Sequence, residues 1–507
     1  MQLFSRSRPG LTTLAAGVAL TAVAGFGVQA GAGSSAPRAD AASTPQTSTV
    51  SAAAKKARPN VLLVTVDDMT YDDLRRLPRL KKLMASTGAT FTNHVAPTPL
   101  CVPARASLLT GQYAVNHGAK SISGPSGGAR SLAGSDGNTL PVALKKAGYH
   151  TSFFGKYLNG YGSSKANGVP SSDVPPGWSK WRGSVDGATY NFSMAKVRTG
   201  RKDKVYRKYS TNVWAGLVND EIRQRGKGKK PWYINVNYVA PHHGGPKDAG
   251  DPKTQKTPSP EKKFFNSRKS ANMVKKKSRY TNIVNGPVRR EFNEQQRKDV
   301  REAFQQRLES LTSVVNGMQR HVKALRKTGQ LKNTYIVFVS DNGYMLGEHN
   351  RVGKLAHYRE SLGVPMLVRG PGITGGRTVN SLTAHVDLPV TIAALAGTRI
   401  NRTVDGIDLR RLWKGDSFTG RVVPITAWAV SNGSKRLYRG VRVDDAWTYV
   451  KQSDGNEEMY DLRNDPLELT NVAGKRASAA QRARLRTWTD TYDDCAGNAC
   501  DRSVVWK

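Results

Sequence analysis

Cysteine is scarce in this chain: only three occur among 507 residues, Cys101, Cys495 and Cys500. So few cysteines allow at most one disulfide within the chain. Cys495 and Cys500 lie five positions apart near the C-terminus, where they either close a small loop or remain two free thiols. A disulfide would suit an oxidising compartment. Cys101 would then stand alone, as expected of a cysteine with a chemical role.

Long apolar runs are scarce as well. Arg6 and Arg8 precede an apolar, alanine-rich run from 11 to 28, and Val28-Gln29-Ala30 fits a small-residue cleavage site. This pattern predicts a signal peptide over residues 1–30 and a secreted protein, with a retained N-terminal tether as the alternative. No other segment approaches about 18 apolar residues, so no further membrane span is expected. Residues 31–57, rich in Ala, Ser and Thr, predict a disordered linker.

Acidic residues are about half as frequent as basic ones. The 38 Asp and Glu residues oppose 78 Lys and Arg, which gives a formal net charge of +40. A charge of this size concerns partners rather than the fold, and it favours surface binding to polyanions. Residues 244–290 hold thirteen basic and three acidic side chains. This segment is predicted to be a solvated loop or, alternatively, a surface that attracts polyanions, with no specific nucleic-acid site.

Buried parallel strands are predicted where continuous apolar, β-branched runs occur, at 60–66, 149–154, 232–238 and 334–340. Helical patterns lie between them, over 140–147, 291–327 and 387–396. Alternating strands and helices predict an α/β sandwich with a large, mostly parallel central sheet flanked by helices. Polar residues follow each strand, at the carboxyl ends where such sheets bind their ligands.

The pattern changes after about residue 402. Strands are predicted over 422–430, 439–451 and 458–462, followed by a basic helix over 478–492 with Ser478 as its N-cap. We therefore expect one large domain over 58–401 and a small C-terminal α+β subdomain with an antiparallel sheet over 402–507.

Two of the buried strands end in oxygen-bearing side chains. Asp67 and Asp68 follow the first strand, and Asp341 and Asn342 follow the last. Carboxylate and amide oxygens suit a hard cation, Ca²⁺ or Mg²⁺, rather than zinc. Either pair alone could be a helix cap or a turn. Both pairs at strand ends favour a metal site, because adjacent carboxylates repel each other unless a cation lies between them.

The most distinctive motif is Cys101-Val102-Pro103-Ala104-Arg105, followed by Ser107-Leu108-Leu109-Thr110-Gly111. A cysteine beside a chance proline and arginine would be the simpler interpretation of the first part alone. The full block resembles the signature of the sulfatase family, and further motifs in sulfatase order extend the resemblance over about 59–473. They are Val66-Asp67-Asp68, Gly155 to Tyr161, Ala240-Pro241-His242, Ser340 to Tyr344, Gly353-Lys354, Val364 to Gly372 and Tyr460-Asp461-Leu462. The sequences Gly-Lys-Tyr-Leu-Asn at 155–159 and Val-Arg-Gly-Pro-Gly at 368–372 are most similar to those of N-acetylglucosamine-6-sulfatases of the heparan and keratan type.

This resemblance implies an alkaline-phosphatase-like fold with residues 58–401 as the catalytic domain. It implies a sulfuric ester hydrolase acting on sulfate monoesters, such as those of N-acetylglucosamine-6-sulfate-like sugars in glycosaminoglycans. A formylglycine-generating enzyme would oxidise Cys101 to formylglycine, whose hydrate would attack sulfur and form a covalent sulfate intermediate.

The resemblance also implies roles for individual residues. Asp67, Asp68, Cys101, Asp341 and Asn342 would hold Ca²⁺, with Mg²⁺ as the alternative. Arg105 would steady the formylglycine hydrate. Lys156, His242 and Lys354 would bind the sulfate, and Lys354 is the candidate acid for the leaving oxygen.

Two positions depart from the family pattern. Many sulfatases carry serine immediately before the arginine of the signature and histidine two residues after the catalytic lysine, where this chain has Ala104 and Leu158. Asn159 or another histidine would have to replace the missing one, or the role is absent. His349 and His357 lie near the expected pocket without an assigned role, and His117 is expected to be structural.

Two alternative functions remain open on the sequence alone. One is a phosphonate monoester or phosphodiester hydrolase of the same superfamily, because phosphoryl and sulfuryl groups are similar in shape. The other is a non-catalytic protein whose positive charge binds polyanions.

Overall fold

The computed structural model describes residues 58–248, 250–269, 290–444, 446–500 and 503–507. The predicted signal peptide over 1–30 and the linker over 31–57 lie outside these residues, as does part of the basic segment, 270–289. Among the helices that are described, none is long and apolar enough to cross a membrane.

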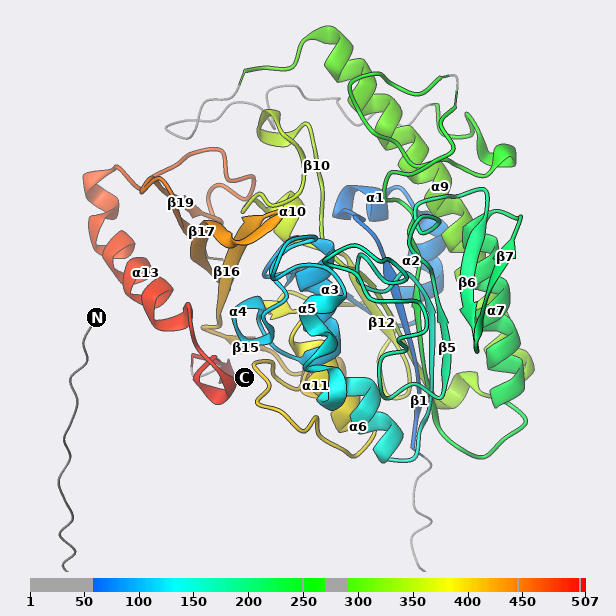
Figure 1. Ribbon diagram of the computed structural model, residues 1–507. Helices are drawn as coiled ribbons and strands as arrows, with labels where there is room; N and C mark the ends of the chain where they lie inside the picture. The colour runs from blue at the N-terminus through cyan, green and yellow to red at the C-terminus, as the bar shows by residue number, and fades with distance from the viewer. Residues whose placement is uncertain (1–57, 249, 270–289, 445, 501–502) are drawn as a thin grey trace, which may run out of the picture. The chain divides into compact units, whose positions relative to one another are not determined.

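An eight-stranded sheet occupies the centre of the larger part of the fold, in the order β13-β2-β12-β9-β1-β8-β4-β5 (Figure 1). Its strands are β1 (Asn60–Val66), β2 (Ala89–Phe91), β4 (His150–Gly155), β5 (Lys180–Gly183), β8 (Trp232–Asn237), β9 (Thr334–Ser340), β12 (Met366–Arg369) and β13 (Arg377–Val379). β12 runs antiparallel to both of its neighbours, and the other neighbouring pairs are parallel. The predicted mostly parallel sheet is confirmed.

The central strand β1 shows why the sheet is buried on both faces. All seven of its residues are buried, and alternate side chains enter two different cores. Val61 and Leu63 pack with α3 (Cys101–Thr110), α6 (Leu140–Lys146) and α11 (Asp387–Leu395). Leu62 and Val64 pack with α2 (Pro78–Met84), α7 (Ser210–Arg225) and α9 (Glu294–Lys327). Helices therefore cover both faces, as Figure 1 shows.

Smaller elements connect these layers. The short helices are α1 (Tyr71–Arg75), α4 (Ala114–His117), α5 (Arg130–Ala133), α10 (Arg359–Leu362) and α12 (Arg410–Lys414). The two-stranded pairs are β3 (His94–Val95) with β14 (Thr383–Ala384), β6 (Ala195–Thr199) with β7 (Lys202–Tyr206), β10 (Met345–Leu346) with β11 (Val352–Gly353), and β15 (Phe418–Thr419) with β20 (Val505–Trp506).

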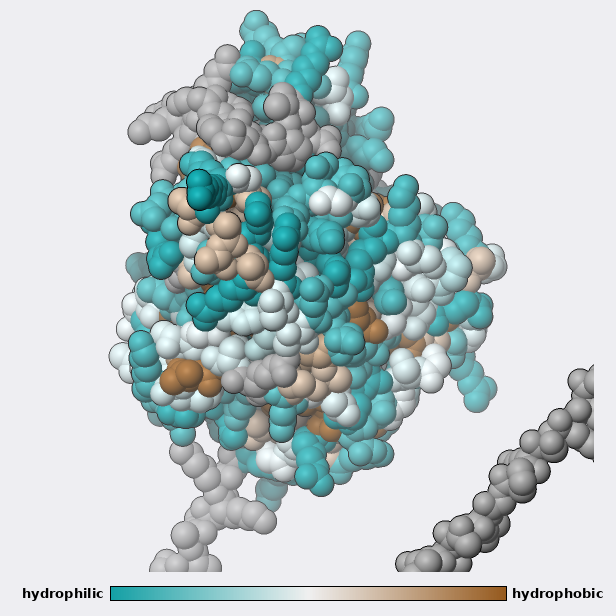
Figure 2. All heavy atoms as spheres, turned by 90° about the vertical axis from the view of Figure 1, so that its left-hand side faces the viewer, coloured by the Kyte–Doolittle hydropathy of each residue, from teal (hydrophilic) through white to brown (hydrophobic). Residues whose placement is uncertain are grey.

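A four-stranded antiparallel sheet follows in the C-terminal part, as predicted. It consists of β16 (Val422–Ala429), β17 (Asn432–Val443), β18 (Trp447–Gln452) and β19 (Glu457–Asp461) in that order. Leu485 and Tyr492 of α13 (Ala479–Tyr492) share a core with Val441 and Tyr449 of this sheet. The face on which α13 and β19 lie is mostly hydrophilic, with apolar side chains in small separate groups (Figure 2).

One prediction for this part is wrong. The expected single strand over 439–451 is two antiparallel strands, because a turn separates them: the amide of Ala446 donates to the carbonyl of Val443 at 2.8 Å. The Asp444 carboxylate accepts from the amides of Leu382 and Gly420, outside the sheet. Ser478 is the N-cap residue of α13, as predicted, although its side chain makes no capping hydrogen bond and a 3₁₀ turn over Arg476–Ser478 precedes the helix.

The structure decides between the two alternatives for the C-terminal cysteines. Cys495 and Cys500 form a disulfide. Cys101 is free and fully buried.

Candidate active site

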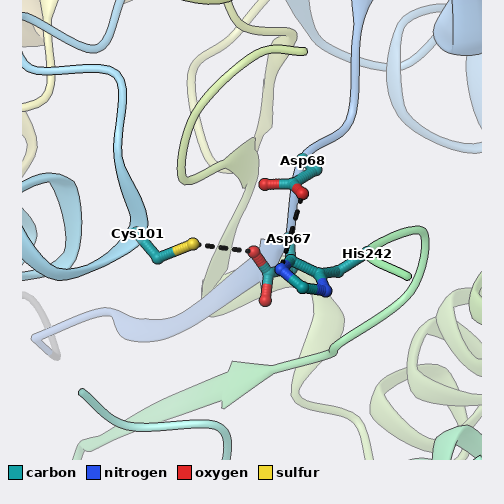
Figure 3. Close-up of side chains that lie close together, drawn as sticks. All are labelled: Asp67, Asp68, Cys101 and His242. Atoms are coloured by element: carbon teal, nitrogen blue, oxygen red, sulfur yellow. Dashed lines mark hydrogen bonds and ion pairs between the residues drawn. The ribbon is translucent and has the colours of Figure 1, made fainter. Parts of the chain in front are cut away.

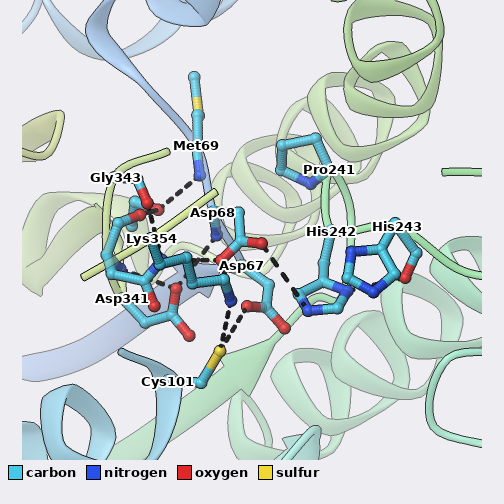
Figure 4. A network of polar contacts seen from close by, with 12 residues as sticks. Asp67, Asp68, Met69, Cys101, Pro241, His242, His243, Asp341, Gly343 and Lys354 are labelled. Atoms are coloured by element: carbon cyan, nitrogen blue, oxygen red, sulfur yellow. Dashed lines mark hydrogen bonds and ion pairs between the residues drawn. The ribbon is translucent and has the colours of Figure 1, made fainter. Parts of the chain in front are cut away.

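The carboxyl ends of the central strands bring the predicted site residues together (Figure 4). Asp67 and Asp68 follow β1, Lys156 follows β4, and His242 follows β8 after a short Tyr238–Pro241 segment. Asp341 and Asn342 follow β9, Cys101 and Arg105 lie on α3, and Lys354 follows β11. Hydrogen bonds and ion pairs join all nine residues into one network, in which Asn342 donates to Oδ1 of Asp68 at 2.7 Å.

Cys101 is the first residue of α3 and points toward the strand ends. Its Sγ lies 3.4 Å from Oδ1 of Asp67 and 2.8 Å from Nζ of Lys354. Burial, together with the charge of Asp67, raises the pKa of the thiol to about 12. The unmodified side chain is therefore a neutral thiol at physiological pH, which is a weak nucleophile.

Arg105 lies four residues after Cys101, so both side chains project from the same face of the helix. Its Nε donates to Oδ2 of Asp341 at 2.8 Å. One terminal nitrogen donates to the carbonyl of Lys156 at 2.9 Å and to Oδ1 of Asn237 at 3.2 Å. Burial opposes the charge of this guanidinium, but Asp341 and Asp67 outweigh it and raise its pKa. Arg105 thus connects α3 by hydrogen bonds to the ends of β4, β8 and β9.

The two adjacent aspartates each contact a lysine. Lys156 donates to Asp67, and Nζ of Lys354 lies 2.6 Å from Oδ1 of Asp68. Burial opposes ionisation of both acids, yet Lys156 lowers the pKa of Asp67 and Lys354 lowers the pKa of Asp68 below their ordinary values. Both carboxylates are therefore charged although fully buried.

His242 approaches the same carboxylates from β8. Its Nδ1 donates to the carbonyl of His243 at 2.7 Å, which leaves Nε2 facing Oδ2 of Asp68 at 3.7 Å (Figure 3). Burial holds the pKa of His242 well below its ordinary range. The ligand atoms of Asp67, Asp68, Cys101 and His242 all lie within 4.8 Å of one another.

The residues present fit a hard divalent cation. Two buried oxygens at this point, Oδ2 of Asp68 and Oδ1 of Asn342, have no hydrogen-bond partner. Burial and the charge of Asp67 raise the pKa of Asp341 to about 6, which reflects the crowding of three carboxylates. Buried oxygen acceptors without donors, beside several carboxylates, are the groups that Ca²⁺ or Mg²⁺ would satisfy.

Some residues at the site were missed in the sequence. The ring of Tyr190 lies 4.9 Å from Nζ of Lys156 and its centroid 4.6 Å from that of His242. Tyr190 belongs to a loop without a recognisable motif. Arg307 of α9 donates to the carbonyl of Asp68 and to the carboxylate of Asp73. A signal existed for Arg307, because it interrupts the apolar face of its helix.

The positions that depart from the family pattern are buried or bonded elsewhere. Leu158 and Ala104 lie in the core, at 2% and 1% exposure. Asn159 donates to the hydroxyl of Tyr190 at 2.9 Å, so it lies beside Lys156 and His242 through that ring.

The three histidines to which the sequence assigned no catalytic role, His117, His349 and His357, contact neighbouring groups. Nδ1 of His117 accepts from the amide of Ala119 at 3.1 Å. His349 stacks on Tyr358, and Nε2 of His357 lies 3.1 Å from Oε2 of Glu458.

Comparison with known proteins agrees with this geometry. Residues 59–398 match the sulfatase family, and residues 347–491 match the C-terminal region of N-sulphoglucosamine sulphohydrolase. The N-acetylglucosamine-6-sulfatase of Homo sapiens is 30% identical over 88% of this chain and 87% of its own length.

Solved structures share the fold. One, determined in complex with its substrate D-glucosamine-2-N,6-O-disulfate, has a TM-score of 0.65 at 20% identity and covers 85% of this chain and 97% of that one. A phosphonate monoester hydrolase of Agrobacterium radiobacter has a TM-score of 0.58 at 22% identity, covering 86% and 97%. The predicted alkaline-phosphatase-like fold is confirmed, and with a family match over most of its length, this chain belongs to the sulfatases, the enzymes that hydrolyse sulfate esters.

Proposed function

We propose that this protein is a secreted, Ca²⁺-dependent sulfatase that removes sulfate from N-acetylglucosamine-6-sulfate or a similar sulfated sugar. The observation that carries the proposal is the position of Cys101. Its side chain lies between a carboxylate of the candidate metal site, Asp67, and a partly buried ammonium group, Lys354. A reacting sulfate ester needs a nucleophile, a cation and a proton donor within a few ångströms of one another.

Cys101 would be oxidised to formylglycine by a formylglycine-generating enzyme. The hydrate of that aldehyde would supply the nucleophile and, through its second hydroxyl, the means of releasing sulfate. Asp67, Asp68, Asp341 and Asn342, with residue 101, would hold Ca²⁺, which would neutralise charge on the sulfate oxygens.

The remaining side chains of the site would position the ester and move the proton. Lys156 and His242 would bind sulfate oxygens. Lys354 would protonate the departing alcohol, since its Nζ lies 2.8 Å from Sγ of Cys101, where the ester would react. Asp68 raises the pKa of this ammonium group against the opposing effect of burial, which keeps the proton on Lys354 before the reaction. Arg105 would hold residue 101 and Asp341 in place.

The sugar substrate is inferred from relatives. The human protein that covers most of this chain is an N-acetylglucosamine-6-sulfatase, and a protein with the same fold binds a glucosamine sulfated at the 6-oxygen. The N-terminal pattern of residues 1–30 supports secretion.

The test is sulfate release measured with the purified protein. We expect release from N-acetylglucosamine-6-sulfate, loss of at least about 1,000-fold in kcat/KM in Cys101→Ala, and an aldehyde in place of the thiol in the mass spectrum of the peptide that contains position 101. Active, calcium-loaded protein with an ordinary thiol at this position would overturn the proposal.

The phosphonate hydrolase remains the second candidate, because such an enzyme shares the fold. Parallel assays with a sulfate monoester and a phosphodiester separate the two. A polyanion-binding protein without catalysis would release no sulfate, and Cys101→Ala would then change nothing.

A further inference from the structure

Three segments on one side of the central sheet carry basic side chains and no acidic ones. Residues 74–92, 310–340 and 361–386 together contain twelve Lys or Arg residues and neither Asp nor Glu. None of the nine residues of the candidate active site belongs to them, and they lie outside the basic segment 244–290. The positive charge of these segments therefore needs an explanation of its own.

The fold places the three segments next to one another. β12 pairs with β2 and β9, and β13 pairs with β2. α2 and α9 lie on the same side of this sheet (Figure 1), where Leu80 and Met318 share a core with Leu367 of β12. Arg79 of α2 donates to the side chain of Gln319 on α9, which joins the two helices at the surface.

Five side chains from these segments form a surface that we call the basic face: Arg79, Lys82, Lys323, Arg326 and Arg369. Arg79 and Lys82 lie one turn apart on α2 and are exposed. Lys323 and Arg326 lie one turn apart on α9 and are exposed as well. Arg369 ends β12 and donates to the carbonyl of Leu83 on α2 at 2.7 Å. The basic face therefore combines two helices and the end of a strand.

The charges of the basic face are not neutralised by acidic partners. In the described part of the chain none of its five side chains forms an ion pair, and Asp72, shortly before α2, pairs with Arg75 instead. Burial and the positive charge of Arg326 lower the pKa of Arg369. Cations that repel one another in this way are stabilised when an anion binds between them.

Local helix preferences explain only part of the basic face. Lys82 and Arg326 lie in the last turns of their helices, where the helix dipole favours a cation. Arg79 lies in the first turn of α2, where the dipole disfavours a positive charge, and Arg369 is not in a helix. A shared anionic partner accounts for the two positions that the dipole does not explain.

The positions of the charges indicate an extended ligand. Gln319, which contacts Arg79, and Arg326 are seven residues apart on α9, or about 10 Å along the helix. The four helical side chains are exposed, so they do not line an enclosed pocket of the kind that holds a small ligand. An extended polyanion, with charged groups at regular intervals, would contact several of them at once. A sulfated polysaccharide is such a polymer, and it belongs to the proposed substrate class.

The basic face is too far from the active site to hold the sugar that reacts. Arg307 contacts the carbonyl of Asp68, and Lys323 follows Arg307 by sixteen residues on the same helix. At about 1.5 Å per residue, these two positions on α9 are about 24 Å apart. The basic face would therefore contact a different part of a long chain.

We propose that the basic face is a second binding site for sulfated polysaccharide, which holds the enzyme on a long chain while other sulfate esters of that chain reach the active site. The inference rests on the proposed function, which names the polymer. Binding at the basic face does not depend on catalysis, so the two are tested separately.

The test compares a face variant with the unaltered protein. The face variant carries four substitutions: Arg79→Gln, Lys82→Gln, Lys323→Gln and Arg326→Gln. We expect its affinity for heparin to fall at least about tenfold in about 0.15 M NaCl. The slope of log K against log[NaCl] should become smaller by at least about two, because each lost contact reduces the number of counterions released. Calorimetric titration at several salt concentrations measures both quantities.

Sulfate release supplies the second readout. The kcat/KM for N-acetylglucosamine-6-sulfate should stay within about twofold in the face variant, which also shows that the variant is folded. The kcat/KM for a long polysaccharide that contains N-acetylglucosamine-6-sulfate should fall at least about fivefold, because the chain is captured less often.

The matched control removes four charges at exposed positions of the C-terminal part: Lys435→Gln, Lys475→Gln, Arg476→Gln and Arg484→Gln. Its heparin affinity should change by less than about threefold. Equal losses in the two variants would overturn the basic face, since net charge alone would then explain binding. Loss of binding to phosphatidylglycerol vesicles with unchanged heparin affinity would also overturn it, and would assign the face to a membrane. The expected heparin results without sulfate release from any substrate would instead overturn the proposed function.

Discussion

The buried oxygen atoms without donors are the clearest sign of function at the scale of single residues. Oδ2 of Asp68 and Oδ1 of Asn342 are shielded from water and have no hydrogen-bond partner. A buried polar atom left in this state costs about 1–3 kcal/mol. Such a cost is tolerated where another group binds the atom, as the proposed cation would.

Removing the negative charge of Asp68 should weaken the binding of the proposed cation. After treatment with a chelator, we expect Ca²⁺ to restore sulfate release and to raise the midpoint of thermal unfolding. Asp68→Asn should need at least about 100-fold more Ca²⁺ for the same recovery, because a charged ligand becomes a neutral one. A calcium titration followed by both activity and thermal unfolding measures this.

Asp72→Asn is the control, because Asp72 lies nearby on α1 but pairs with Arg75 at the surface. Its calcium dependence should be unchanged. Activity that survives chelation, or an Asp68→Asn variant with the calcium dependence of the unaltered protein, would contradict the metal site.

The sequence predicted those site residues that belong to strand ends or to a motif. Asp67 and Asp341 follow buried strands, and Cys101 lies in a signature, so position along the chain was informative. Tyr190 reaches the site from an irregular loop, where neither periodicity nor strand ends constrain the path of the chain. Arg307 reaches it from the middle of a 34-residue helix, where a charge on the apolar face was its signal but did not say which residues it would contact.

Among the elements, long regular ones were predicted well and short ones poorly. The periodic pattern of α9 is continuous, and a capping box formed by Asn293 and Gln296 sets its start. The strand expected over 439–451 was divided by a turn, because an apolar pattern on both sides of a hairpin resembles one long strand. β12, antiparallel in an otherwise parallel neighbourhood, could not be recognised from its composition, since direction depends on how the chain crosses the sheet.

A buried histidine of α9 bonds to α7 and to the segment after β8, and its burial predicts an effect of pH on stability. Nε2 of His321 accepts from the hydroxyl of Tyr238 on the segment after β8 at 2.8 Å, and Nδ1 donates to Oδ1 of Asn219 on α7 at 2.7 Å. Burial, with a smaller effect of Arg320, lowers the pKa of His321 to about 3. Its ordinary pKa is about 6.5, so below that pH the unfolded chain binds a proton that the folded chain does not.

This histidine should therefore make the protein less stable as the pH falls. Stability from neutral His321 is complete above about pH 6.5, and about 1.4 kcal/mol of it is lost between about pH 7.5 and 5.5. His321→Gln should be less stable than the unaltered protein by about 1–3 kcal/mol at the higher pH, with a difference that narrows by about 1.4 kcal/mol at the lower one. Guanidinium unfolding at the two pH values measures the difference.

Lys323→Gln, an exposed substitution on the same helix, should show no such narrowing. A constant difference between His321→Gln and the unaltered protein at both pH values would show that His321 does not contribute to acid sensitivity.

At the scale of the whole molecule, the net charge and the proposed site would act together on a polyanionic substrate. The formal charge of +40 would extend the attraction for sulfated polymers beyond the reach of Lys156, His242 and Lys354. Attraction at long range raises the rate of encounter, whereas contacts within the site are shielded from salt by burial. The two contributions should therefore respond differently to ionic strength.

We expect the kcat/KM for a sulfated polysaccharide to fall about tenfold or more as NaCl rises from about 0.05 to 0.5 M, since the screening length shortens over this range. The kcat/KM for N-acetylglucosamine-6-sulfate, which carries a single charge, should change by less than about threefold over the same range. Cys101→Ala, which removes chemistry but not charge, should still bind heparin with the salt dependence of the unaltered protein. If both substrates respond equally to salt, the surface charge makes no contribution to substrate capture, and the basic composition must serve another purpose.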